Sequence, residues 1–190
     1  MQLILKNKLS KYKSLIGLLI ICLIASIISP RFLTISNISN VLTQVSVNAI
    51  IAAGMTFVIL TGGIDLSVGS ILAISGAVAA SIVSSSSNVI FSLIVALIIG
   101  SLIGLINGVL VSKGKVQAFI VTLASMTIFR GVTYVFTDGT PISRLGNAFG
   151  TLGNSKLFGK IPYPVILTIV VFFISYYVLT QTRFGRYVYA

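Results

Sequence analysis

Few residues in this chain could carry out chemistry, and their types exclude most enzyme mechanisms. The 190-residue sequence has no histidine, one cysteine (Cys22) and two acidic residues, Asp65 and Asp138. Histidine is the commonest metal ligand and general base, so its absence removes the usual start for a metal site or acid–base catalysis. The sequence has no GxxxxGK(S/T) phosphate loop, and no serine or threonine has a visible activating base. It therefore predicts no active site, no cofactor and no metal.

One of the two carboxylates stands in a glycine-rich break between two apolar stretches, in the segment LTGGIDLSVGS (residues 60–70). Gly62 and Gly63 disfavour a continuing helix and permit a sharp turn. Asp65 then stands where a new helix would begin. As its N-cap, the carboxylate is expected to accept from the backbone N–H two or three residues further on, near the positive end of the helix dipole. Two compatible interpretations stay open: a cap on a broken or re-entrant connection, or a flexible joint or pathway wall in a transporter.

An arginine interrupts the apolar stretch 117–136. Arg130 lies fifteen residues after Lys115, about 22 Å along a helix and so beyond the middle of a membrane-spanning segment. Six polar residues fall within about 140° on a helical wheel: Thr122, Thr127, Arg130, Thr133, Tyr134 and Thr137. This face is expected to point into a helix bundle or a wet cavity. The alternatives for Arg130 are snorkelling to the headgroups, an interhelical anchor and the lining of a pathway.

Small residues are spaced for close helix packing. One ladder, with a step of four residues, consists of Ala96, Gly100, Gly104 and Gly108. In lipid, where hydrophobic force does not drive helices together, such ladders let backbones approach closely. Packing within one subunit is the preferred interpretation, and an interface between subunits is the alternative. Asn107 lies beside the ladder, where its amide could hydrogen-bond to a neighbouring helix.

The elements that carry these residues are predicted to be membrane-spanning helices. Hydrophobic residues make up 56% of the chain and charged residues 8%, whereas soluble domains have about 25% charged residues. A bilayer core needs about 20 apolar residues per helix. The sequence therefore predicts an all-α integral membrane protein, with a basic segment over 1–13 and a transmembrane domain over 14–190. About six spans are expected: 14–29, 41–60, 66–84, 89–111, 117–136 and 165–180, with a helix break at 61–66.

Basic residues separate the apolar stretches and do not form a stripe. The formal net charge is +11, but this placement is typical of orientation signals and argues against nucleic-acid binding. With an inner N-terminus, the basic residues on the inner side are Lys6, Lys8, Lys11, Lys13, Lys113, Lys115, Arg183 and Arg186. Those on the outer side are then Arg31, Arg144, Lys156 and Lys160. The inner excess predicts a multi-pass membrane protein with a cytoplasmic N-terminus.

Three segments resemble the permease subunits of ribose-type ABC importers, in the branched-chain amino acid/ribose permease superfamily. They are GMTFVILTGGIDLSVGS (54–70), GLINGVLVSKGKVQAFIVTLASMTIFRG (104–131) and TDGTPI (137–142). The terminal TRFGRYVYA is similar to the start of the family's cytoplasmic loop that engages the ATPase. The resemblance covers about residues 31–190 and is nearest to the ribose permeases. It places in the matching motifs Gly62, Gly63, Asp65, Ser67, Gly69, Asn107, Thr122 and Arg130.

The resemblance implies a homodimeric membrane pore that is not itself an enzyme. Its implied partners are a second permease copy, an extracytoplasmic sugar-binding protein that sets most of the specificity, and an ABC ATPase subunit. Family members are substantially longer, so the chain is expected to be a C-terminally truncated permease: a fragment, a split gene product or a truncated frame. The expected function is import of ribose or a related monosaccharide. The alternatives are a permease for xylose, galactose or an autoinducer-type sugar, a non-transporting scaffold, and a gradient-driven carrier that uses Asp65.

Overall fold

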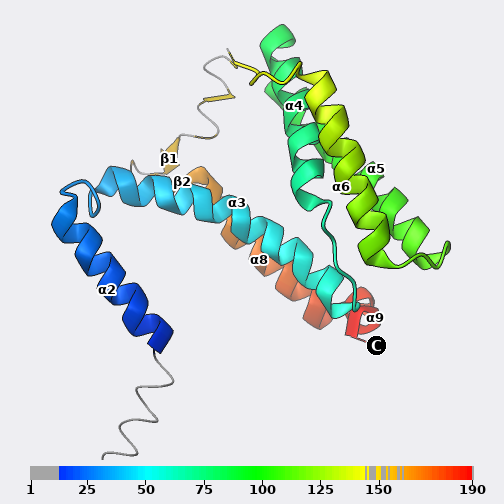
Figure 1. Cartoon of the computed structure of the whole chain (residues 1–190), viewed down its shortest axis with the longest axis horizontal. Coiled ribbons are helices and arrows are strands. Elements are labelled where there is room, and N and C mark those ends of the chain that lie inside the picture. The colour runs from blue at the N-terminus through cyan, green and yellow to red at the C-terminus, as the bar shows by residue number, and fades with distance from the viewer. Residues whose placement is uncertain are drawn as a thin grey trace, which may run out of the picture. The chain divides into compact units, whose positions relative to one another are not determined.

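The computed structural model describes residues 13–143, 145, 149–150, 153, 155–157, 159 and 161–189. The described chain is mostly helical (Figure 1). It divides into two compact units, Met1–Gln44 and Val45–Ala190, each of which is described by itself. Except for Lys13, the predicted basic segment 1–13 lies outside the described residues, as do the predicted outer cations Arg144 and Lys160.

The first unit contains α2 (Lys13–Ile28) and the beginning of α3 (Ile35–Leu60). The Thr34 hydroxyl oxygen accepts a hydrogen bond from the Asn37 N–H at 3.3 Å, which is an N-cap contact. Because this polar segment supplies a cap and a first turn, α3 begins six residues before the predicted start at residue 41.

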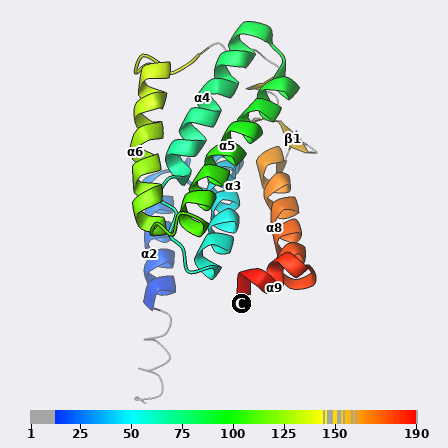
Figure 2. The ribbon, with the colours of Figure 1, turned by 90° about the vertical axis from the view of Figure 1, so that its right-hand side faces the viewer.

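The second unit contains a bundle of three helices, α4 (Val68–Ser86), α5 (Val89–Ser112) and α6 (Ala118–Phe136). Both views show them side by side, and α4 packs against both of the others (Figures 1 and 2). The short polar turn between α4 and α5 ends at Asn88, whose side chain accepts from the Phe91 N–H at 3.1 Å and caps α5.

The rest of the second unit consists of β1 (Lys156–Leu157), β2 (Ile161–Pro162), α8 (Tyr163–Gln181) and α9 (Arg183–Tyr189). The two strands pair antiparallel, and β2 leads directly into α8. Thr168 Oγ1 on α8 donates to the Ser46 carbonyl oxygen on α3 at 3.2 Å. The ring of Phe184 on α9 lies 6.3 Å, centroid to centroid, from the ring of Phe57 on α3.

Five of the six predicted spans form helices that are long and apolar enough to cross a membrane, judged by length and composition. These are α3, α4, α5, α6 and α8. The first predicted span, α2, has 16 residues in the described part, about 24 Å of helix against a bilayer core of about 30 Å. The structure therefore confirms the all-α membrane class, with a shorter apolar helix in the first position.

Among the described residues, many of the buried side chains are polar and many large apolar side chains are exposed, unlike in a soluble domain. The buried polar residues are Ser39, Ser46, Ser67, Ser70, Ser75, Ser92, Asn107, Thr122 and Ser125. Large apolar side chains lie outside instead: Leu97 is 71% exposed and Val135 75%. A soluble protein would bury these apolar groups, whereas helices in lipid pack through small and polar residues. The bundle is therefore organised for a membrane.

Candidate functional site

The chain between α3 and α4 is a non-helical break over residues 61–67, as the sequence predicted. Gly62 has a φ of +75°, in the left-handed region. Its N–H donates to the Ile59 carbonyl at 2.9 Å, and the Gly63 N–H donates to the Val58 carbonyl at 3.0 Å. This pair of bonds is the Schellman motif that ends a helix. The two glycines therefore terminate α3 and turn the chain toward α4.

Gly62→Ala is expected to lower the free energy of unfolding by about 1–2 kcal/mol, because a Cβ disfavours the left-handed conformation by that amount. Gly54→Ala is the matched control, since Gly54 lies within α3 and a Cβ there would meet no atom within 4 Å. Denaturant unfolding in detergent micelles measures both variants. Equal stabilities of the two variants would contradict this role for Gly62.

The Asp65 carboxylate closes a turn inside the break. Its Oδ1 accepts from the Ser67 N–H at 2.8 Å and from Ser67 Oγ at 2.5 Å. The predicted bond to the N–H two residues on is confirmed. The prediction that Asp65 is the N-cap is wrong, because α4 begins at Val68 and Ser67 holds the N-cap position. The Ser67 side chain turns back to the carboxylate and makes no capping bond to its own helix.

Asn107 on α5 joins this turn to α6. Its Nδ2 donates to Ser67 Oγ at 3.1 Å, and its Oδ1 accepts from Ser125 Oγ at 2.5 Å. The structure thus contains the hydrogen bonds between helices that the position of Asn107 beside the glycine ladder suggested. We call Asp65, Ser67, Asn107 and Ser125 the polar lock.

Three members of the polar lock are buried, and the fourth, Asp65, is half-buried. Ser67 is 0% exposed, Asn107 5% and Ser125 8%. Among the described residues, no buried side-chain nitrogen or oxygen lacks a partner. Since an unpaired polar group away from water costs several kcal/mol, separating α4 from α5 or α6 here is unfavourable. The lock therefore fixes the first turn of α4 against two helices.

Thr122 on α6 makes a second hydrogen bond to the break. Its Oγ1 lies 3.1 Å from the Ile64 carbonyl oxygen, across the helix boundary, and 2.8 Å from the Ala118 carbonyl oxygen of its own helix. Thr122 is 4% exposed. The predicted site residues Asp65, Ser67, Asn107 and Thr122 are thus brought together around one short segment.

Thr122→Val is expected to lower the free energy of unfolding by about 1 kcal/mol, because the hydroxyl is lost while the shape is kept. Thr122→Ser retains the hydroxyl and serves as the control, with an effect smaller than that of the valine. Thermal unfolding in detergent compares the two. A serine variant as unstable as the valine variant would show that the methyl group, and not the hydrogen bond, matters here.

Sequence reasoning missed Ser125, the member of the lock on α6. A serine in an apolar helix carries little signal by itself. Ser125 lies three residues after Thr122, however, and residues at that spacing share a helix face. This spacing was the signal that could have identified it.

A second polar site is a cavity of about 390 Å³ between α4 and α6, which we call the Arg130 pocket. It is lined by Gly69, Ser70, Ala73, Arg130, Thr133, Tyr134, Thr137, Gly139 and Thr140. The predicted polar face of α6 is thus divided. Four of its six members line this pocket, Thr122 lies near the polar lock, and Thr127 lines a mostly apolar cavity with Ile128 and Val132.

The glycine ladder of α5 is only partly covered in the described part of the chain. A Cβ on Gly100 would lie 3.8 Å from Cγ2 of Ile71 on α4, whereas nothing lies within 4 Å at Gly104 or Gly108. Gly100 therefore packs inside the bundle. The role of Gly104 and Gly108 in helix packing stays a prediction.

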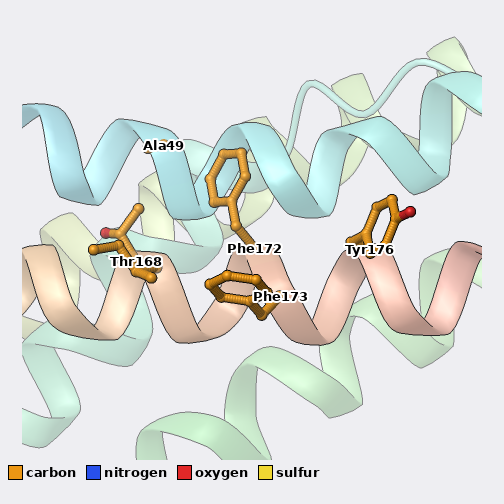
Figure 3. Close-up of a pocket in the computed structure, with 6 residues that line it drawn as sticks. Ala49, Thr168, Phe172, Phe173 and Tyr176 are labelled. Atoms are coloured by element: carbon orange, nitrogen blue, oxygen red, sulfur yellow. The ribbon is translucent and has the colours of Figure 1, made fainter.

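The largest cavity described, about 640 Å³, lies between α3 and α8 (Figure 3). Its lining residues, none of which the sequence singled out, are Ala49, Thr168, Ile169, Phe172, Phe173 and Tyr176. Phe172 projects from α8 toward α3. These described lining residues include no charged group and are mostly apolar. This groove suits an apolar chain or a neighbouring helix and offers few groups to a polar solute. The polar lock and the Arg130 pocket, which contain the polar residues, therefore form the candidate site.

Comparison with known proteins places the chain among membrane permeases. The family described as branched-chain amino acid transport system / permease component matches residues 37–190. The ribose import permease protein RbsC of Escherichia coli (strain K12) is 50% identical over 189 residues, which cover 97% of this chain and 59% of that protein. RbsC of Bacillus subtilis (strain 168) is 50% identical over 184 residues, covering 96% of this chain and 57% of that protein.

A less similar relative is the D-allose transport system permease protein AlsC of Escherichia coli (strain K12). It is 38% identical over 182 residues, which cover 95% of this chain and 56% of that protein. No solved structure matches the chain significantly. The chain spans less than two thirds of the length of these curated relatives. Since the family match covers most of its residues, the chain belongs to the family of branched-chain amino acid transport system permease components.

Proposed function

We propose that this chain forms part of the translocation pathway of an ATP-driven importer for ribose or a related monosaccharide. The observation that carries the proposal is the 50% identity to ribose import permeases over nearly the whole chain. Relatives named for D-allose and L-arabinose are only 38% and 34% identical. This lower identity favours ribose over these two sugars as the proposed solute. The described residues contain no group of three or more histidine, cysteine or acidic residues that could hold a metal ion. The proposed role, which the similarity to import permeases supports, is passage of a solute, with ATP hydrolysis in a partner.

The proposed orientation has the N-terminus in the cytoplasm of a bacterial cell. The positive-inside excess of the sequence supports it, with Lys113 and Lys115 in the short turn between α5 and α6. In this orientation α3 and α8 end on the cytoplasmic side, and α9 lies there. The contact of Phe184 with Phe57 then ties α9 to the inner end of α3, which leads directly into the break.

The proposed partners are those implied by the similarity to ribose import permeases, placed in this orientation. An ABC ATPase subunit would engage the inner face near α9, and an extracytoplasmic sugar-binding protein would deliver the solute from outside. A second permease copy would complete the pore, with the uncovered positions Gly104 and Gly108 available for close packing. A movement of α9 would be transmitted to the break through the contact of Phe184 with Phe57 on α3. The polar lock would meanwhile keep the start of α4 in position.

Uptake of labelled ribose tests the proposal. The full reading frame that encodes this chain is expressed with its ATPase and sugar-binding protein in cells that lack their own ribose importer. ATP-dependent accumulation of ribose is expected, in preference to allose and arabinose. An assembly that inserts into the membrane in normal amount and takes up no monosaccharide would contradict the proposal.

A further inference from the structure

We propose that the Arg130 pocket is a site at which a neutral, polyhydroxylated solute binds on its way through the membrane. The inference rests on the proposed function and names the residues that contact the sugar. Three features support it: the depth of Arg130 in the membrane, the donors and acceptors of the pocket, and its connection to the polar lock.

The position of Arg130 requires water or a polar partner beside it. Arg130 lies twelve residues after the start of α6 and six before its end, about 18 Å and 9 Å along the helix axis. The residue is exposed, and toward the described residues its guanidinium makes neither a hydrogen bond nor an ion pair. A charged side chain at such depth is costly in lipid and faces a bundle interior or a wet cavity. The pocket is therefore expected to open to the pathway.

The threonine hydroxyls of the pocket donate their protons to backbone carbonyls. Thr133 Oγ1 donates to the Phe129 carbonyl at 2.6 Å, and Thr137 Oγ1 donates to the Thr133 carbonyl at 2.9 Å. Thr140 Oγ1 donates to the Thr137 carbonyl at 2.9 Å. Each oxygen still has free lone pairs and can accept a further hydrogen bond. The pocket thus offers hydroxyl acceptors opposite a guanidinium with free N–H donors.

This combination matches a sugar better than an anion. Each hydroxyl of a sugar is both a donor and an acceptor, so it can donate to a threonine oxygen while a neighbouring hydroxyl accepts from Arg130. An anion would pair with Arg130 but would have to draw the threonine hydroxyl protons away from their backbone carbonyls, whereas a sugar hydroxyl can donate to the threonine oxygens as they stand. A volume of about 390 Å³ lies within the range of small-molecule sites, which begins at about 300 Å³.

An aromatic ring, that of Tyr134, forms one wall of the pocket. Tyr134 is 69% exposed, and a Cβ on Gly139 would lie 2.9 Å from its ring. Gly139, with a φ of +65°, therefore leaves room for the ring. A tyrosine ring presents an apolar face and a polar hydroxyl, which suits the C–H face and the rim of a sugar.

The pocket is connected to the polar lock through α4. Ser70, which lines the pocket, donates its hydroxyl proton to the Ser67 carbonyl at 2.8 Å. Ser67 is the residue that Asp65 and Asn107 hold in place. The α4 wall of the pocket is therefore positioned by the buried network, which explains why the motif residues and the solute site lie next to each other.

Charge removal provides the first test, in the complete importer with its ATPase and binding protein. Arg130→Gln is expected to lower the rate of ribose uptake roughly tenfold to a hundredfold, the factor that corresponds to a hydrogen bond from a charged group. Arg31→Gln, at an exposed arginine between α2 and α3, is the matched control and should transport normally. Unchanged uptake in Arg130→Gln at an equal membrane level would overturn the inference.

Protection of an engineered cysteine provides a test that needs no transport. Cys22 is the only cysteine, so Cys22→Ser gives a cysteine-free background for Thr137→Cys in the pocket. A water-soluble thiol reagent should label Thr137→Cys, and ribose at millimolar concentration should slow the labelling at least threefold. Thr127→Cys, on the apolar side of the same helix, should show no protection. Protection by inorganic phosphate but not by ribose, or equal protection at both positions, would overturn the inference.

The two tests separate the inference from the proposed function. Ribose uptake by the unmutated importer with no protection of Thr137→Cys leaves the permease function standing and overturns the pocket. Protection by ribose in an assembly that accumulates no ribose supports the pocket and contradicts the importer.

Discussion

Asn107→Leu is expected to lower the free energy of unfolding of this chain by about 2–3 kcal/mol. The asparagine side chain is buried and makes both of its bonds to other segments, to Ser67 Oγ and from Ser125 Oγ. Leucine has a similar volume but cannot donate or accept. The Ser125 hydroxyl then loses its acceptor and the Ser67 oxygen loses a donor, and each buried group left unpaired costs about 1–3 kcal/mol. Hydrogen bonds measured between membrane helices contribute less than most buried hydrogen bonds. The expected loss of stability is therefore smaller than the two penalties added at their upper values.

Denaturant unfolding in detergent, followed by far-UV circular dichroism, measures this effect. Ser101→Leu is the matched control, because Ser101 lies on the same helix, is exposed and makes no side-chain hydrogen bond within the described chain. The control should change stability by less than about 0.5 kcal/mol, as is usual for surface substitutions. If the two leucine variants were equally stable, the polar lock would have no part in holding the bundle.

Asp65→Ala is expected to have an effect of similar size, about 2–3 kcal/mol, whereas Asp65→Asn should cost less than about 1 kcal/mol. The carboxylate accepts from both the N–H and the hydroxyl of Ser67, and hydrogen bonds to a charged group contribute about 1.5–3 kcal/mol each. Because Asp65 is partly exposed to solvent, the expected effect is smaller than the sum of these two hydrogen-bond contributions. The Oδ1 of asparagine can accept the same two bonds, so the turn survives without the charge.

Uptake by the same two variants separates a structural carboxylate from one that carries a proton. Asp65→Asn should retain most ribose uptake and its pH dependence, while Asp65→Ala should lose uptake along with the position of α4. Loss of uptake in Asp65→Asn at normal stability would favour the gradient-driven carrier that the sequence left as an alternative.

Local features of the fold were predictable from the sequence because their causes are local. Gly62 and Gly63 ended α3, and the predicted bond from Asp65 to the N–H two residues on was found. The bounds of α5 and α6 agree with the predicted spans within one residue, because each is a long apolar stretch bounded by polar residues. The start of α3 was missed because a polar segment with its own N-cap can be helical outside a bilayer span.

Contacts between helices were less predictable, because they depend on how each helix is rotated. Asn107 was identified as a residue that could bond to another helix, but its partners Ser67 and Ser125 follow only from the packing of α4, α5 and α6. The wheel placed Thr127 on the same face as Arg130, yet the two line different cavities. A face of about 140° is wider than one contact between two helices, so the wheel could not separate these residues.

Disulfide cross-linking in native membranes tests the central claim, that the break between α3 and α4 is held against α5 by side-chain contact. Cysteines replace Ser67 and Asn107 in the Cys22→Ser background, and a protease site inserted between α4 and α5 reveals whether the two fragments stay joined. Oxidation should join the fragments for the pair Ser67→Cys and Asn107→Cys, and leave them separate for Ser67→Cys with Ser101→Cys. Failure of the first pair to cross-link, or cross-linking of the second pair instead, would contradict the claim.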